Sequence, residues 1–331
     1  MQETTTQAGA EPHPVTAEAI ERAAAELHAH LSPTPLQYSR AFTAKAGCHV
    51  YLKIEGIQPT RAFKVRGALN KLMQLRPEER AAGVITASAG NHGLGVAYAA
   101  QAFRTPATVY VPDGANPLKV QAIKRMGGRV VQFGRSYDDA YREALRAQET
   151  SGSIFVHAFD DPAVVTGQGC VGVELLEQLP AADTVLVPVG GGGLIAGVAQ
   201  YLKARRPSVR VIGVEPAGAD ALTRSLAAGE LVTLDRVDTM ADGLAAKTAG
   251  RIALSIASAC VDLMITVEET EMLRAIRLYF EWEHLLAEPA GAAALAALLY
   301  HYAPEATERV VVLLSGANVA DEVMLRALKS R

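Results

Sequence analysis

The chain has 331 residues, of which half are hydrophobic and a fifth are charged, and its formal net charge is −3 at pH 7. This length favours two domains over one small core, and the near-neutral charge gives no basic surface for nucleic acid or an anionic membrane. Three widely spaced cysteines without a CxxC pair argue against a disulfide framework or a structural zinc site, and they favour the reducing cytoplasm.

The predicted elements alternate between strand and helix along most of the chain. Residues 1–14 are polar, lack the apolar core of a signal peptide, and are predicted to form a disordered tail. Strand-like apolar runs span 83–88, 107–112, 129–134, 184–189, 209–216 and 309–316, and helical patterns occur at 91–103, 116–127, 136–150 and 193–206. This alternation predicts an α/β fold of open parallel sheets with helices on both faces.

The grouping of these units predicts two domains. Units within 82–158 are expected to form a small domain, and residues 15–81 with 159–331 are expected to form a larger one. The uncharged stretch 184–202 is about as long as a membrane span, but Pro188 and four glycines divide it into strand, loop and helix. We therefore expect no membrane-spanning segment.

Four consecutive glycines at 190–193 lie between a predicted strand and a predicted helix. Glycine lets backbone N–H groups approach an anion, and the helix N-terminus adds partial positive charge, so phosphate is the expected ligand. A plain tight turn is the alternative. Gly191, Gly193 and Ala196 also fit G-x-G-x-x-A, and Glu215 follows about 20 residues later, which leaves an NAD-dependent oxidoreductase open.

A second loop at a strand end, "SAGNHG" at 88–93, carries Ser88, Asn91 and His92. Its N–H groups and polar side chains suit a carboxylate ligand. Capping of the following helix by Ser88 or Asn91 explains the same residues equally well. This loop alone therefore does not decide between a ligand site and a helix cap.

Lys64 follows Phe63 at the expected start of a helix, with Arg66 two residues further on. The helix dipole, burial against Phe63 and the charge of Arg66 would all lower the pKa of the lysine amine. A neutral lysine is a nucleophile that forms Schiff bases, although a lysine that snorkels over an apolar patch is the commoner alternative. Together with a phosphate loop and a carboxylate loop, Lys64 indicates a pyridoxal phosphate enzyme that acts on an amino acid.

Several motifs in a fixed order extend this interpretation over nearly the whole chain after the tail. They are "TPLQYS", "LKIEGIQPTRAFKVRGA", "TASAGNHGLGVAYAA", "FDDPAVVTGQG", "VPVGGGGLIAGVA", "ADGLA", "AEPAGA" and "LLSGANV". In this order they resemble the threonine/serine dehydratases and serine racemases, of fold type II among the pyridoxal phosphate enzymes. The resemblance implies a tryptophan synthase beta-like fold of two open parallel-sheet domains, with the cofactor in the cleft between them.

The resemblance also implies roles for individual residues. Lys64 would bind the cofactor as a Schiff base and later move the Cα proton of the substrate, and Ser315 would face the pyridine nitrogen. The cofactor contacts would be Phe63, Lys64, Asn91, Gly190, Gly191, Gly192, Gly193, Gly243, Glu288 and Ser315, and the substrate carboxylate would be bound by Ser88, Ala89, Gly90, Asn91 and His92.

The implied activity is a lyase reaction that releases a 2-oxo acid and ammonia from a β-hydroxy amino acid such as L-threonine or L-serine. A hydroxyl at Ser315, unlike a carboxylate, does not keep the ring nitrogen protonated, which favours elimination over transamination. Racemases of the family carry a serine where this chain has Ala89, so we favour dehydration over racemisation. Dehydration of 3-hydroxyaspartate or phenylserine stays open, because enzymes acting on these compounds share the scaffold.

Cation binding and assembly are further expectations from the resemblance. Relatives that bind a divalent cation use a glutamate like Glu215, a carbonyl like that of Ala219, and an aspartate where this chain has Ala221. A divalent or monovalent cation at Glu215 and Ala219 is thus a weaker expectation. Much of the family is dimeric, so a homodimer or higher homo-oligomer is expected, and the apolar segment 287–302 is predicted to be core or interface.

Overall fold

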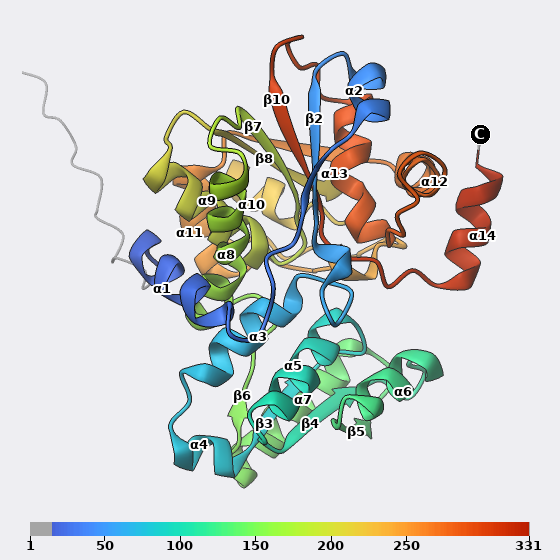
Figure 1. Cartoon of the computed structure of the whole chain (residues 1–331). Helices are drawn as coiled ribbons and strands as arrows, with labels where there is room; N and C mark the ends of the chain where they lie inside the picture. The colour runs from blue at the N-terminus through green and yellow to red at the C-terminus, as the bar shows by residue number, and fades with distance from the viewer. Residues whose placement is uncertain (1–14, 331) are drawn as a thin grey trace, which may run out of the picture.

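The computed structural model describes residues 15–330, and the predicted disordered tail at 1–14 lies outside the described residues. Its strands form two separate sheets, one of six strands and one of four. Figure 1 shows the six-stranded sheet and its helices in the upper part of the molecule, with the four-stranded sheet below them.

The large sheet has the strand order β1–β2–β10–β7–β8–β9. Its strands are β1 (Leu36–Tyr38), β2 (His49–Ile54), β7 (Thr184–Pro188), β8 (Arg210–Pro216), β9 (Leu263–Val267) and β10 (Arg309–Leu314). β1 pairs with β2 in the antiparallel direction, and all other neighbours are parallel. This order places β10, from the end of the chain, in the middle of the sheet between β2 and β7.

The small sheet has the order β5–β4–β3–β6 and is parallel throughout. Its strands are β3 (Val84–Ala87), β4 (Ala107–Val111), β5 (Arg129–Gln132) and β6 (Ile154–Phe155), and its helices are α5 (Asn91–Ala102), α6 (Pro117–Arg125) and α7 (Tyr137–Ser151). Val109 and Val111 pack with α5 and α6, whereas Tyr110 packs with α7. Helices therefore cover both faces, because successive strand residues point to opposite sides.

Helices also cover both faces of the large sheet. Val185 and Val187 of β7 point into one hydrophobic cluster, and Leu186 points into another. The first cluster includes α1 (Ala17–Leu27), α3 (Lys64–Met73), α8 (Pro162–Gln178), α9 (Gly193–Arg205) and α11 (Arg251–Cys260), and the second includes α2 (Arg40–Ala46), α12 (Glu269–Glu283), α13 (Pro289–Tyr300) and α14 (Asp321–Lys329). The other described helices are α4 (Pro77–Ala82), α10 (Ala221–Ala228), and the short 3-10 helices η1 (Glu55–Ile57) and η2 (Asp242–Leu244).

The α/β fold with two parallel-sheet units predicted from the sequence is confirmed. The strands of the small sheet lie within residues 84–155, inside the predicted small domain, whose boundaries stay a prediction. α13 is buried along residues 289–298, so most of the apolar segment at 287–302 belongs to the core.

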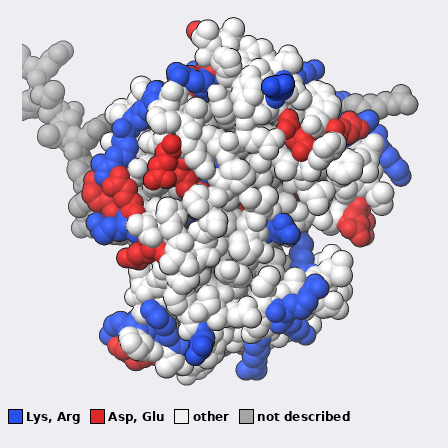
Figure 2. Space-filling view, in the orientation of Figure 1, with Lys and Arg blue, Asp and Glu red and all other residues white. Residues whose placement is uncertain are grey.

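No helix between residues 15 and 330 is long and apolar enough to cross a membrane. Figure 2 shows acidic and basic side chains interspersed over the large-sheet unit.

Candidate active site

Helix α3 begins at Lys64, as the sequence predicted, and packs against both α5 and α8. The lysine amine donates a hydrogen bond to the carbonyl of Ala158 (Nζ–O 2.9 Å) and lies 5.1 Å from the centre of the Phe63 ring. Burial lowers the pKa of Lys64 to about 8, although the carboxylate of Glu288 opposes this shift. An appreciable fraction of the amine is therefore an unprotonated nucleophile near neutral pH.

Arg66 does not lower the pKa of Lys64 as we expected. Its guanidinium binds the carboxylate of Glu55 at 2.7 and 2.8 Å and that of Glu174 at 2.6 and 2.9 Å. Lys53 also binds Glu174 (Nζ–Oε2 2.6 Å), and these four side chains are buried. The expectation was right about burial, which lowers the pKa of Lys64, and wrong about Arg66, because two carboxylates neutralise the guanidinium. This buried ion cluster (Lys53, Glu55, Arg66 and Glu174) ties α3 to α8.

The loop after β3 is not closed by a side-chain cap. Helix α5 begins at Asn91, and its N-cap residue Gly90 provides no side-chain hydrogen bond. Ser88 Oγ instead accepts from the N–H of Gly90 at 3.1 Å. The capping interpretation of this loop was therefore wrong, and the first turn of α5 presents N–H groups that a carboxylate could accept from.

The His92 side chain contacts the protein backbone and not the place where such a ligand would bind. Its Nε2 lies 2.9 Å from the carbonyl oxygen of Val156. Burial, with a smaller effect from the charge of the nearby Lys64, lowers the pKa of His92 to about 3, so the imidazole is neutral. Its Nδ1 is buried without a hydrogen-bond partner among the described residues. A role for His92 in carboxylate binding would therefore use its backbone N–H.

Asn91 lies at the centre of a polar chain. Its Nδ2 donates to Glu288 Oε1 (2.6 Å), and its Oδ1 accepts from Nδ2 of Asn318 (2.7 Å). Asn318 also donates to the carbonyl of Thr60 at 2.9 Å. Asn318 is not among the site residues predicted from the sequence, although it lies in the "LSGAN" loop, where a polar side chain just after a strand end is a signal for a site residue. The chain fixes which way the Asn91 amide points.

Glu288 precedes α13 and is buried beside Asn91. Burial raises the pKa of its carboxyl group to about 7, while the hydrogen bond from Asn91 acts in the opposite direction. A Cβ built on Gly316 would lie only 2.4 Å from Glu288 Oε1, and one built on Gly243 would lie 3.6 Å from it. Glycine at position 316 thus leaves room for this carboxylate, whereas a side chain on Gly243 would only touch it.

Replacing Glu288 with glutamine tests this pKa in the cofactor-free protein. A carboxyl group whose pKa is raised from 4.5 to about 7 on folding contributes stability that is present below pH 4.5 and lost as the pH rises through 7. The amide of the substituted glutamine would still accept from Asn91 but would not titrate. We therefore expect Glu288→Gln to raise Tm by roughly 2 to 5 °C at pH 8 and to leave it unchanged near pH 4.5. A difference in Tm that is independent of pH would contradict the shift.

The four-glycine loop joins β7 to α9. Gly192 has a φ of +87°, which favours glycine. A Cβ on Gly191 would lie 2.3 Å from the Phe159 ring, and a Cβ on Gly190 would lie 2.9 Å from the carbonyl oxygen of Gly243. Close packing therefore explains part of this glycine run. The loop also leads into the N-terminus of α9, which has no side-chain cap. The first N–H groups of a helix have no intrahelical carbonyl to bond, so they can bind a ligand.

The end of β10 lies beside the start of α3. The N–H of Phe63 donates to the carbonyl of Ser315 (3.1 Å), and Ala62 forms an isolated bridge with Gly316. The Ser315 side chain is buried, with Oγ 3.4 Å from the carbonyl oxygen of Ala290. The fold thus brings Lys64, Asn91, Glu288, Ser315 and the glycine loop to the carboxyl ends of β3, β7 and β10, where parallel sheets bind ligands.

The carboxylate suggested for a cation, that of Glu215, is bonded within the protein. Glu215 Oε1 accepts from the N–H of Leu222 (2.9 Å), and Oε2 accepts from the N–H and hydroxyl of Thr223 (2.8 and 2.6 Å). Both oxygens thus bond the first turn of α10. Within residues 15–330, no group of three or more histidine, cysteine, aspartate and glutamate side chains could hold a metal ion.

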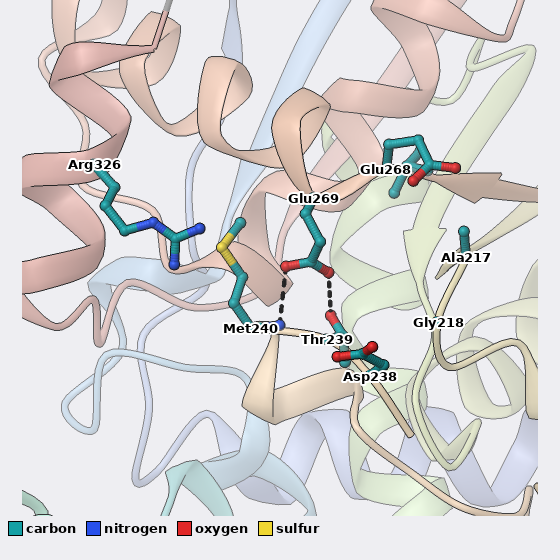
Figure 3. A pocket seen from close by; sticks show the side chains of 9 residues that line it. Ala217, Gly218, Asp238, Thr239, Met240, Glu268, Glu269 and Arg326 are labelled. Atoms are coloured by element: carbon teal, nitrogen blue, oxygen red, sulfur yellow. Dashed lines mark hydrogen bonds between the residues drawn. The ribbon is translucent and has the colours of Figure 1, made fainter. Parts of the chain in front are cut away.

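A pocket of about 560 Å³ lies elsewhere, at the carboxyl ends of β8 and β9. It is lined by Ala217, Gly218, Asp238, Thr239, Met240, Val267, Glu268, Glu269 and Arg326, none of which is a predicted site residue. In Figure 3, Glu269 points towards Thr239 and Met240 and accepts from the hydroxyl of the first (2.6 Å) and the N–H of the second (2.9 Å). These bonds anchor the chain shortly before Gly243.

Comparison with known proteins agrees with this site. Residues 27–316 match the family described as pyridoxal-phosphate dependent enzyme. An L-threonine ammonia-lyase of Geobacter sulfurreducens is 44% identical over 300 residues, covering 91% of this chain and 75% of the relative. The structure of maize serine racemase has a TM-score of 0.90 at 34% identity, covering 95% of this chain and 97% of that one. The processed form of threonine deaminase isoform 2 from Solanum lycopersicum has a TM-score of 0.89 at 35% identity, covering 96% and 94%.

These matches cover nearly the whole described chain, and they replace the oxidoreductase interpretation of the glycine loop. The chain belongs to the family of pyridoxal-phosphate-dependent enzymes.

Proposed function

We propose that this enzyme is an ammonia-lyase that converts a β-hydroxy amino acid such as L-threonine or L-serine to a 2-oxo acid and ammonia by β-elimination. The observation that carries the proposal is the Lys64 amine, with its pKa lowered to about 8, in a chain 44% identical to an L-threonine ammonia-lyase. Elimination removes one water from the amino acid and leaves an enamine, which becomes an imine. Hydrolysis of the imine consumes one water, so the net products are the oxo acid and ammonia.

The residues present fit pyridoxal phosphate. Lys64 would hold it covalently, the glycine loop and the α9 N-terminus would bind its phosphate, and Asn91 and Ser315 would contact its ring. The uncapped N-terminus of α9 supports the phosphate assignment. The bound cofactor would supply an electron sink for the electrons left when the Cα proton is removed.

The chain's own groups would orient the substrate and move its protons. The loop residues Ser88, Ala89 and Gly90, together with the N–H groups of Asn91 and His92, would bind the substrate carboxylate at the start of α5. Lys64 would remove the proton from Cα, and its lowered pKa suits a base that acts near neutral pH. The chain Glu288–Asn91–Asn318 would keep the Asn91 amide in one orientation. A hydroxyl at Ser315 favours elimination over transamination, because it does not keep a pyridine nitrogen protonated.

The test is release of oxo acid by the purified protein supplied with pyridoxal phosphate. L-threonine, L-serine, 3-hydroxyaspartate and phenylserine would be assayed in parallel, with oxo acid and ammonia measured separately. We expect equal amounts of both products from at least one of these compounds. Absence of oxo acid from all four would refute the proposed activity.

Racemisation is the second candidate, because maize serine racemase shares the fold at a TM-score of 0.90. Moving a proton to the opposite face of Cα needs a second acid/base group, and the methyl group of Ala89 cannot supply one. We predict that Ala89→Ser raises the conversion of L-serine to D-serine at least ~10-fold over the wild type. Chiral chromatography of the recovered serine measures this. A wild-type enzyme that racemises as fast as it eliminates would contradict the assignment.

Assembly and location complete the proposal. We propose a homodimer or higher homo-oligomer that works in the cytoplasm on a small amino acid. Large apolar side chains on the surface support an interface, since Tyr38, Trp282 and Leu286 are 41%, 40% and 51% exposed. A cation is not part of the proposal, because helix α10 takes both oxygens of Glu215.

A further inference from the structure

The turn at residues 157–160 connects β6 of the small sheet to α8 of the large-sheet unit and touches several parts of the site. The carbonyl of Ala158 accepts the hydrogen bond of the Lys64 amine at 2.9 Å. The Phe159 ring fills the space where a side chain on Gly191 would lie. Asp160 Oδ1 accepts from the N–H of Ile252 at 3.0 Å. One short turn therefore holds the reactive amine and supports the glycine loop.

His157 organises this turn through its side chain. Its Nδ1 accepts from the N–H of Asp160 at 2.8 Å and from the N–H of Phe159 at 3.3 Å. The imidazole packs edge-on against the Phe159 ring, with 4.7 Å between ring centres, and lies 6.1 Å from the ring of Tyr141. A side-chain acceptor that bonds N–H groups two and three residues later is how aspartate and asparagine stabilise turns.

We propose that His157 is a positioning residue for the reaction: its unprotonated Nδ1 holds the turn in which the Ala158 carbonyl places the Lys64 amine and Phe159 supports the glycine loop. The proposal rests on the function proposed above, because it assigns the positioning to the reaction of Lys64. Misplacing a reacting group by about 1 Å can cost roughly 100-fold in rate, so a turn that sets the place of the amine matters for kcat.

The protonation state of His157 distinguishes this role from simple packing. A protonated Nδ1 would face two N–H donors and could accept from neither, so the turn would lose its organising bonds. Burial lowers the pKa of His157, and Lys64 lowers it further, whereas Asp160 and Asp161 oppose the shift. The other ionisable groups near it are Tyr141 of α7 and His92 of α5. Because its pKa is lowered, the imidazole is neutral at pH values at and above the ordinary pKa of histidine. Protonation of Nδ1 at acid pH should therefore weaken the turn.

Two substitutions of His157 test its role as a hydrogen-bond acceptor separately from the space that its ring fills. In His157→Asn the side-chain Oδ1 takes the place of Nδ1 as an acceptor and does not titrate, whereas His157→Leu fills space without accepting. We expect His157→Leu to lower kcat about 10- to 100-fold with little change in KM, and to weaken pyridoxal phosphate binding at least ~10-fold. We expect His157→Asn to keep both within about threefold of the wild type. It should also hold pyridoxal phosphate at acid pH where the wild type releases it.

The measurements are the dissociation constant of pyridoxal phosphate, from its absorbance, and kcat and KM between pH 5 and 9. The exposed His28→Leu is a matched control and should behave as wild type. Wild-type cofactor affinity and kcat in His157→Leu would overturn the proposal, as would an asparagine variant as impaired as the leucine one. If His157→Leu does not fold, the proposal can still be tested by comparing how cofactor binding depends on pH in His157→Asn and in the wild type.

These readouts separate the inference from the proposed function. If the wild type binds pyridoxal phosphate but releases no oxo acid from any β-hydroxy amino acid, the proposed function fails. The cofactor affinities of wild type and the two variants, and their pH dependence, then still decide whether His157 positions the turn. An unchanged pH dependence of cofactor binding in His157→Asn would refute the inference while leaving the lyase activity intact.

Discussion

Replacing Lys64 with alanine is expected to reduce ammonia release by at least about 1,000-fold, because the variant loses both the nucleophile and the proton-transferring group. The wild-type protein with pyridoxal phosphate should show a visible absorption band that borohydride bleaches irreversibly. The variant should not retain the cofactor through denaturation after borohydride treatment. Ammonia release and cofactor retention together measure the effect.

A matched control keeps this result specific. Lys45 lies exposed in the last turn of α2, so Lys45→Ala should retain wild-type activity and cofactor binding. The Lys64→Ala protein should also remain folded, because the amine donates a single hydrogen bond to Ala158. A variant at position 64 with full activity would contradict the mechanism. Loss of activity together with loss of folding would call for Lys64→Arg as a replacement that retains charge.

Replacing Arg66 with leucine is expected to cause the largest loss of stability of any change discussed. The guanidinium bonds two buried carboxylates, those of Glu55 and Glu174, and removing one partner of a buried ion pair costs about 3 to 5 kcal/mol because a charge is left uncompensated. We expect the Tm of the cofactor-free protein to fall by roughly 5 °C or more at pH 7.5. Differential scanning calorimetry measures this shift.

The pH dependence of that loss identifies its cause. Although burial raises the pKa of Glu55, the guanidinium of Arg66 brings it below its ordinary value. In the wild type, the stability that the ionised Glu55 contributes is therefore present above pH 4.5 and lost as the pH falls through the lowered pKa. In Arg66→Leu the buried carboxyl would have a raised pKa, so its protonated form would be stable in acid. The Tm difference between the two proteins should be largest near neutral pH and should narrow towards pH 5.

An exposed pair is the control for Arg66. Arg142 binds Asp139 at 2.7 Å on the surface of α7, where the arginine side chain is 73% exposed. Surface pairs contribute little because water screens them, so Arg142→Leu should change Tm far less than Arg66→Leu. Equal shifts in the two variants, or a shift at Arg66 that does not vary with pH, would argue against the buried ion cluster as the source of stability.

Local patterns in the sequence determined the elements and the chemistry of their loops. The apolar run at 184–189 and the glycines at 190–193 predicted a strand, a loop and a helix start, which are β7, the glycine loop and α9. Likewise, the position of Lys64 behind Phe63 predicted a lysine at a helix start with a lowered pKa, and α3 begins there. These features depend on residues close in sequence, through side-chain period, glycine conformation and helix ends.

The tertiary structure alone decided which distant side chains meet. Arg66 and Glu174 are 108 residues apart, and Asn91 and Asn318 are 227 apart. Arg66 is two residues from Lys64 in the sequence, but in the fold its guanidinium binds two carboxylates instead of acting on Lys64. Likewise, Ser88 looked like a helix cap and closes its own turn instead.

The physical reason lies in the strand order. The large sheet puts β10 between β2 and β7, so loops from opposite ends of the chain meet at one edge. Side-chain partners across that edge depend on which buried charges must be neutralised and which helices pack together, because an unpaired buried charge is costly. No local pattern encodes those choices, so the sequence predicted the residues of the site, while the fold selected the partners that orient them.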